Sequence, residues 1–205
     1  MRHTKMILVV TLTGIALGLV ALIVTKRYLY EPIDCHDIQK SFAVLAKTSQ
    51  KSPKTALKYR DQFSECGSLA IEFCRNLLLS KTASAPEIIE ATFIISSTKS
   101  QVDAEILVSY ISHPNEEVRI AVAGQLKAYD VTKLGDVIAS ALRVEQKLTV
   151  KVLLVSLLAS TANPKYSDMM EQLEKDSRPT ELDFITPFGS LRHAVAKARL
   201  RLGTR

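Results

Sequence analysis

An uncharged, largely apolar run of twenty residues near the start of the chain most constrains what this sequence can fold into. The run extends from residue 6 to residue 25 (MILVVTLTGIALGLVALIVT). At about 1.5 Å of rise per residue, a helix of this length is roughly 30 Å long, which matches the hydrocarbon core of a bilayer. We therefore expect a transmembrane helix that tethers the rest of the chain to a membrane.

A cleaved secretory signal is the alternative interpretation of this run. Such a signal has a shorter apolar stretch of about 7–15 residues and ends in a small-x-small cleavage site. Here the run ends in Val24 and Thr25 and is followed by Lys26 and Arg27. The length and this ending favour an uncleaved signal anchor.

The orientation of the anchor is not decided by counting flanking charges. Arg2 and Lys5 precede the run, and Lys26 and Arg27 follow it, so the positive-inside rule gives equal weight to both sides. The short basic tail is typical of a signal anchor whose downstream domain is exported. We therefore expect the bulk domain on the non-cytosolic side, in a periplasm or an organelle lumen.

The remainder of the chain predicts one all-α domain. Residues 1–27 form the tail and anchor, residues 28–33 a connector, and residues 34–205 a helical domain. Apolar positions recur at helical spacing, and polar, Pro or Gly breaks arrive every ten to fifteen residues. We expect helices over residues 34–48, 53–63, 67–80, 85–96, 101–112, 115–129, 132–143, 146–160, 166–175 and 189–202. No segment alternates with the period of two that a half-buried strand requires.

Charge and composition argue against a nucleic-acid partner. The chain has a formal charge of +6, but residues 1–27 contain four basic and no acidic side chains, which leaves 23 basic against 21 acidic side chains in residues 28–205. The chain has no Trp, and aromatic residues make up 6% of it. Proteins that bind nucleic acids more often carry a concentrated basic face with aromatic side chains for stacking. We expect a protein partner instead.

Three cysteines leave the redox state of the domain open. Cys66 and Cys74 are eight residues apart on one expected helix, roughly 12 Å along its axis, which is too far for a disulfide. Any internal disulfide must therefore join Cys35 to Cys66 or to Cys74. The alternative is that Cys66 and Cys74 are small buried apolar side chains, as free cysteines often are.

The sequence contains no pattern typical of an enzyme. Cys35 and His36 are adjacent, but neighbours on a helix point about 100° apart, so they do not form a nucleophile–base pair. Asp34 is the expected helix cap there. We find no glycine-rich phosphate loop, nucleophile elbow or metal-ligand spacing. The expectation is a non-catalytic protein without a metal or cofactor.

An internal repeat gives the strongest information about architecture. Residues 118–126 (VRIAVAGQL) align with residues 150–158 (VKVLLVSLL) at an offset of 32, with apolar residues opposite apolar residues and Arg119 opposite Lys151. Looser copies are residues 191–199 (LRHAVAKAR) and residues 88–96 (IIEATFIIS). A period in this range is typical of stacked helical repeats. We expect Val118, Ile120, Ala121, Leu126, Leu154 and Leu158 in the core and Glu117 and Lys127 in solvent.

Residues 106–126 (ILVSYISHPNEEVRIAVAGQL) resemble a HEAT-type helical repeat of the short variety. The Pro-bearing turn at His113, Pro114 and Asn115 is followed by the Val118–Arg119 pair, as in that family. Asn115 also suits the N-cap of the second helix.

This resemblance implies an α-solenoid with an extended surface that binds a partner. It also implies structural roles for Asn115 and Val118, and for Arg119, Lys151 and Arg192, which would reach the turn of a neighbouring repeat. The long insert at residues 176–189 departs from the pattern. Its Phe184, Ile185 and Phe188 are expected to fold back as a cap on the last pair, with a partner-binding loop as the alternative.

The sequence thus supports two functions. The first is a membrane-anchored scaffold or adaptor that binds another protein through the surface of its repeats. The second is an accessory subunit or assembly factor of a membrane complex, recognised through its transmembrane helix. Gly14 and Gly18 form a GxxxG spacing that lets two membrane helices approach closely, for self-association or for docking.

Overall fold

The structure, a computed structural model, describes residues 33–203. The expected anchor at residues 6–25, together with Gly14 and Gly18, lies outside the described residues. The chain divides into two units, Met1–Asp34 and Cys35–Arg205, and the second is described here. Within residues 33–203, none of the helices combines the length and apolar character needed to span a bilayer.

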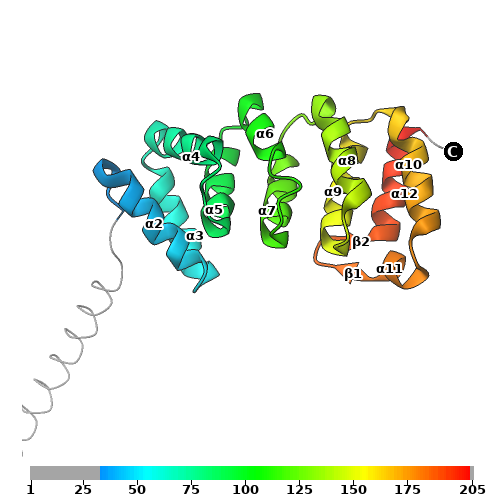
Figure 1. The fold of residues 1–205 in the computed structure, drawn as a ribbon, viewed down its shortest axis with the longest axis horizontal. Helices are drawn as coiled ribbons and strands as arrows, with labels where there is room; N and C mark the ends of the chain where they lie inside the picture. Colours follow the sequence, from blue (N-terminus) through cyan, green and yellow to red (C-terminus); the bar gives the residue numbers. More distant parts are fainter. Residues whose placement is uncertain (1–32, 204–205) are drawn as a thin grey trace, which may run out of the picture. The chain divides into compact units, whose positions relative to one another are not determined.

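The described region is all-helical apart from one small hairpin (Figure 1). Its elements in chain order are η1 (Cys35–Asp37), α2 (Ile38–Ser49), α3 (Pro53–Ser64), α4 (Ser68–Ser80), α5 (Ala85–Ser96), α6 (Gln101–Val108), α7 (Glu116–Leu126), η2 (Thr132–Leu134), α8 (Gly135–Val144), α9 (Leu148–Ser160), η3 (Pro164–Tyr166), α10 (Ser167–Asp176), α11 (Pro179–Asp183), β1 (Ile185–Thr186), β2 (Gly189–Ser190) and α12 (Leu191–Leu202).

The helices pack in sequence order in two rows (Figure 1). One row consists of α5, α7, α9 and α12, each of which packs against the helix before it in the row. The second row consists of α4, α6, α8 and α10, which pack against α5, α7, α9 and α12, respectively. At the beginning of the domain, α2 packs against both α3 and α5.

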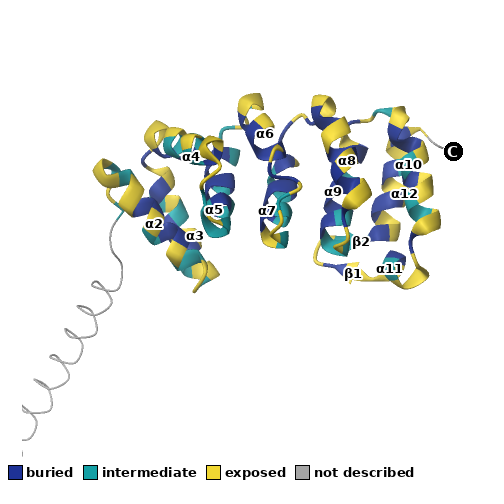
Figure 2. Ribbon diagram, in the orientation of Figure 1, coloured by how far each residue is buried: buried dark blue, intermediate teal, exposed yellow. Residues whose placement is uncertain are grey.

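The core lies where the helices face their neighbours (Figure 2). The most buried helix is α9, whose inaccessible side chains point in every direction because it packs on α7, α8 and α12. As predicted, Val118, Leu126, Leu154 and Leu158 are fully buried, and Ala121 is buried. Ile120 is only half-buried, which has a consequence for the candidate site.

Each of the ten expected helices is present, and the local signals that set their ends are visible. Asn115 is the N-cap of α7 and accepts hydrogen bonds from the backbone N–H groups of Glu117 and Val118. Gly203 ends α12 with a φ of 81°, in the left-handed region that glycine adopts without strain. At the start of the domain, Asp37 rather than Asp34 caps α2 by accepting from the Lys40 N–H.

The expectation of an apolar cap in the insert is wrong. The insert instead forms α11 and a two-stranded antiparallel hairpin in which Thr186 pairs with Gly189. Ser177, Leu182 and Thr186 are its buried side chains, whereas Phe184, Ile185 and Phe188 remain exposed. The chain therefore buries the insert through one leucine and two small hydroxyl side chains, and leaves its large apolar side chains on the surface.

We predict that Leu126→Ala destabilises the domain by about 2–5 kcal/mol, because a fully buried leucine at the end of α7 is replaced by a cavity. Lys127→Ala, one residue further on and exposed, should change stability by no more than about 0.5 kcal/mol. Urea denaturation followed by circular dichroism measures both. Similar small effects at both positions would contradict the packing of α7.

Candidate partner-binding groove

Two fully buried carboxylates are held by arginines from the preceding helix pair. Glu90 on α5 is 1% exposed, and Arg60 on α3 binds it through Nε at 2.9 Å and Nη2 at 3.0 Å. Asp103 on α6 is 0% exposed, and Arg75 on α4 binds it through Nε at 2.6 Å and Nη2 at 2.8 Å. Such two-point contacts fix the position of both groups more firmly than a single hydrogen bond.

A third arginine makes the same kind of connection further along the chain. Arg119 on α7 binds Glu145, in the turn between α8 and α9, through Nε at 2.7 Å and Nη2 at 3.1 Å. Its Nη1 also donates to the carbonyl oxygens of His113 and Pro114. Burial acts to raise the pKa of Glu145, but hydrogen bonds from Arg119 and from the backbone N–H groups of Lys147 and Gln146 hold the pKa below its ordinary value.

These contacts join residues 30, 28 and 26 positions apart, close to the period of the sequence repeat. Each therefore ties one helix pair to the next rather than bracing a single helix. Because one partner of each pair is buried, a shift between neighbouring helix pairs would separate a charge from its counter-ion in a poorly hydrated environment. The arginine contacts consequently fix how the pairs stack.

An apolar groove of about 540 Å³ is lined by residues of α3, α5 and α7. Leu57 of α3, which is 55% exposed, lines it together with the half-buried side chains of Ile89 and Phe93 of α5 and Ile120 of α7. Clefts in which large apolar side chains converge are typical of binding sites. This groove is the candidate site for a partner.

The floor of the groove is held in place by the ion pair described above. The guanidinium carbon of Arg60 lies 4.0 Å from the centre of the Phe93 ring, while the same group binds Glu90. The cation therefore stacks on the aromatic ring and is neutralised by a buried carboxylate. Glu117 stands at the α7 side of the groove, exposed and without an ion pair among the described residues. The groove thus offers a rigid apolar surface with one free negative charge.

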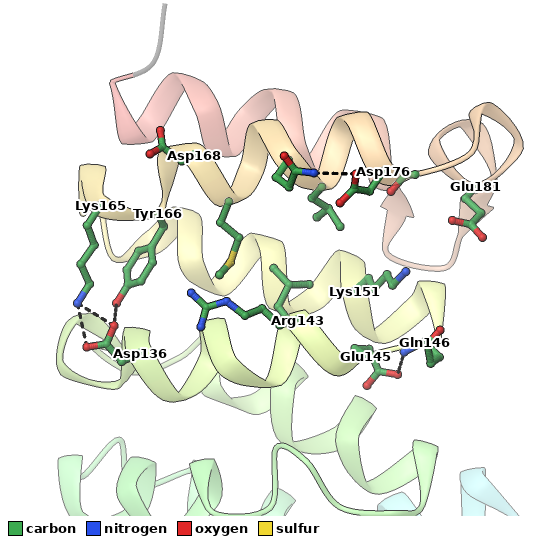
Figure 3. A pocket seen from close by; sticks show the side chains of 15 residues that line it. Asp136, Arg143, Glu145, Gln146, Lys151, Lys165, Tyr166, Asp168, Asp176 and Glu181 are labelled. Carbon is green, nitrogen blue, oxygen red and sulfur yellow. Dashed lines mark hydrogen bonds and ion pairs between the residues drawn. The ribbon is translucent and has the colours of Figure 1, made fainter.

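A second groove, of about 760 Å³, lies between α8 and α10 (Figure 3). At one end, Lys165 and Tyr166 both bind Asp136, and a Cβ at position 135 would overlap the Tyr166 ring, so Gly135 permits this close packing. Arg143 lies in the middle of the lining. Charged residues of both signs line this groove, and several of them are already paired with other side chains, which makes it a less suitable surface for an apolar partner.

The predicted repeat residues occupy different surroundings. Asn115, Val118 and Arg119 lie together at the start of α7, where they cap the helix, fill the core and join the next turn. Lys151 lines the second groove near Glu181, and its side chain makes no hydrogen bond or ion pair within residues 33–203. Arg192 does not reach the turn of a neighbouring repeat: it binds Asp183 of α11 at 2.6 Å, because the insert folds back beside the start of α12.

The structure joins Cys35 of η1 to Cys66 in the turn between α3 and α4 through a disulfide. Cys74 is free and buried on α4, and burial raises its thiol pKa far above the ordinary value. Residues that sequence reasoning overlooked are Glu90 and Asp103, whose arginine partners lie in the preceding helix pair. A search for Arg–acid pairs 26–30 residues apart would have pointed to them.

Comparisons of the chain with protein-family models, with curated proteins and with solved structures find no match. The arrangement of the groove and the arginine contacts therefore has to carry the functional argument.

We predict that Arg60→Ala destabilises the domain more than Arg119→Ala does. Glu90 would be left buried with no other hydrogen bond, a situation that costs about 3–5 kcal/mol. Glu145 would still accept from two backbone N–H groups and should lose less. Chemical denaturation of the two variants measures the difference, with Lys127→Ala as a neutral control. An equal loss in both variants would show that the backbone donors do not compensate.

Proposed function

We propose that this protein is a membrane-anchored, non-catalytic scaffold that binds a segment of another protein in the groove between α3, α5 and α7. In this proposal residues 6–25 form the anchor, and residues 34–205 form a HEAT-like α-solenoid. The groove carries the proposal: it is apolar, spans three helices, and is stiffened by the Arg60–Glu90 ion pair.

The shape and chemistry of the groove indicate the kind of segment that fits it. Three of its apolar side chains, Ile89, Phe93 and Ile120, lie on two neighbouring helices of one row. An amphipathic helix lays such a stripe of side chains into a groove. The free carboxylate of Glu117 at one side favours a basic residue next to the apolar stripe. We therefore expect the partner segment to be amphipathic and basic.

The alternative function is an accessory subunit or assembly factor of a membrane complex that is recognised through residues 6–25. Gly14 and Gly18 support this alternative, since small residues four apart allow close helix contact in a membrane. The two functions differ in which segment the partner requires. Replacing residues 6–25 by an unrelated apolar helix abolishes binding only in the alternative.

For the groove, we predict that Ile120→Glu and Leu57→Glu in the full chain each lower partner recovery by roughly tenfold or more, because a carboxylate would then face an apolar contact. The matched control is Val137→Glu on α8, also an exposed apolar residue but outside the groove. Crosslinking in native membranes followed by quantitative mass spectrometry measures recovery. Unchanged recovery with all three variants would refute a role for the groove.

We also propose that the domain lies outside the cytosol. The Cys35–Cys66 disulfide supports this location, because disulfides persist in oxidising compartments and are rare in the cytosol. Closing a loop with a sequence separation of 31 residues is expected to stabilise the fold by about 3–4 kcal/mol through the loss of entropy in the unfolded chain.

For this location, we predict that Cys35 in intact cells or vesicles resists a membrane-impermeant thiol reagent until its disulfide is reduced, and then reacts without permeabilisation. Cys66 and Cys74 should react only after denaturation as well, because both side chains are buried. Mass spectrometry of the labelled peptides reports each site. Labelling that requires permeabilisation would place the domain in the cytosol.

A further inference from the structure

The exposed apolar side chains of the insert form a patch with two lysines. The patch, called the hairpin patch below, consists of Phe184, Ile185, Phe188, Lys127 and Lys197. Phe184 is 62%, Ile185 78% and Phe188 45% exposed. Three large apolar side chains within five residues, on a hairpin at the edge of the helix rows (Figure 1), are costly to leave in water unless something else covers them.

Lys127 approaches the hairpin from the end of α7, and Lys197 of α12 lies near Lys127. Lys127 directly follows α7, whereas Phe188 precedes α12, yet the Lys127 Nζ lies 5.7 Å from the centre of the Phe188 ring. Because α9 packs between α7 and α12, this contact crosses the surface of α9. The hairpin therefore reaches over α9 and brings its aromatic side chain beside a positive charge.

The positive charge of the patch is not neutralised by the protein. Neither Lys127 nor Lys197 makes an ion pair with any of the residues that the structure describes, while nearby Arg192 is paired with Asp183. Burial lowers the pKa of Lys127, and the positive charge of Lys197 lowers it further. The two ammonium groups are therefore close enough to repel each other. An anionic partner would relieve this repulsion.

We propose that the hairpin patch binds the surface of a bilayer that contains anionic lipids. Phe184, Ile185 and Phe188 enter the interface between headgroups and acyl chains, and Lys127 and Lys197 contact lipid phosphates. Apolar and aromatic side chains combined with basic residues are the composition that suits this interface.

A bilayer fits this patch better than a protein partner does. A stable protein interface buries more than about 1,000 Å² and needs a complementary surface, whereas the patch offers three apolar side chains on a protruding hairpin. Three side chains and two charges give weak membrane affinity on their own. The inference rests on the proposed anchoring, since a tether keeps the patch at high effective concentration near the bilayer and makes a weak contact sufficient.

The test uses the full chain in lipid nanodiscs. Ile185→Cys is labelled with bimane, and quenching by lipids brominated in the acyl chain is compared with that of Val137→Cys, an exposed apolar position on α8 outside the patch. The native cysteines do not interfere, because Cys35 and Cys66 are bonded and Cys74 is buried. Nanodiscs contain phosphatidylcholine alone or with phosphatidylglycerol.

We expect quenching at position 185 but not at position 137, stronger with phosphatidylglycerol and reduced by salt. The double substitution Lys127→Glu and Lys197→Glu should remove the dependence on anionic lipid. Equal quenching at both positions, or no effect of anionic lipid, overturns the proposal. Crosslinking from position 185 to a second copy in place of quenching also overturns it and identifies a protein contact.

A failure of the anchoring itself would be recognised separately. If the full chain does not stay in nanodiscs, residues 6–25 do not anchor it, and the same labelled variants are then mixed with vesicles of both compositions. Sedimentation of the chain with anionic vesicles, lost on the double lysine substitution, would support the hairpin patch without the anchor. No sedimentation with either composition at a lipid concentration high enough to detect a weak contact would overturn the patch as well.

Discussion

The fold depends on the apolar packing between successive helices of one row, which consists of α5, α7, α9 and α12. Most side chains of α9 are buried because α7, α8 and α12 surround it, so no single helix pair could bury this surface alone. The same constraint accounts for the apolar groove. At the start of the row, α2 rather than α3 makes the larger contact with α5, and Leu57 of α3 and Phe93 of α5 consequently stay accessible.

The arginine contacts fix the relative position of neighbouring helix pairs, which apolar packing alone does not. Apolar faces tolerate sliding, whereas a shift of the helix pairs would separate the buried carboxylates of Glu90 and Asp103 from the arginines that bind them. Arg60 and Arg75 remain partly hydrated at the surface, while the carboxylates that they bind are buried. Each contact therefore fixes the position of a surface arginine of one helix pair relative to the interior of the next. Arg60 then serves twice, since it orients the ring of Phe93 inside the groove.

Much of the helical organisation could be predicted from the sequence, because apolar periodicity and capping residues such as Asn115 act locally. The burial of Glu90 could not, since a carboxylate within a helix ordinarily faces solvent and its partner lies 30 residues away. The exposure of the insert could not be predicted for a related reason: Phe184 and Phe188 are as apolar as core residues, and hydropathy alone does not show which side chains stay exposed.

The candidate groove could not be predicted from the sequence. The groove arises from how α2, α3 and α5 pack, which depends on contacts between distant parts of the chain. The repeat alignment placed Ile120 in the core, although its side chain lines the groove. For the disulfide, the sequence narrowed the choice to Cys66 or Cys74, and the return of α3 toward η1 selects Cys66.

If residues 6–25 anchor the chain as proposed, the disulfide has a mechanical consequence for the domain. Any pull transmitted through the residues that precede Cys35 passes across the sulfur–sulfur bond to Cys66 and on into α4. Residues 36–65, which include α2, α3 and one wall of the groove, are left outside this load path. Tension that would otherwise peel the first helices from the stack is carried by a covalent bond, so the groove keeps its shape while the tether is under load.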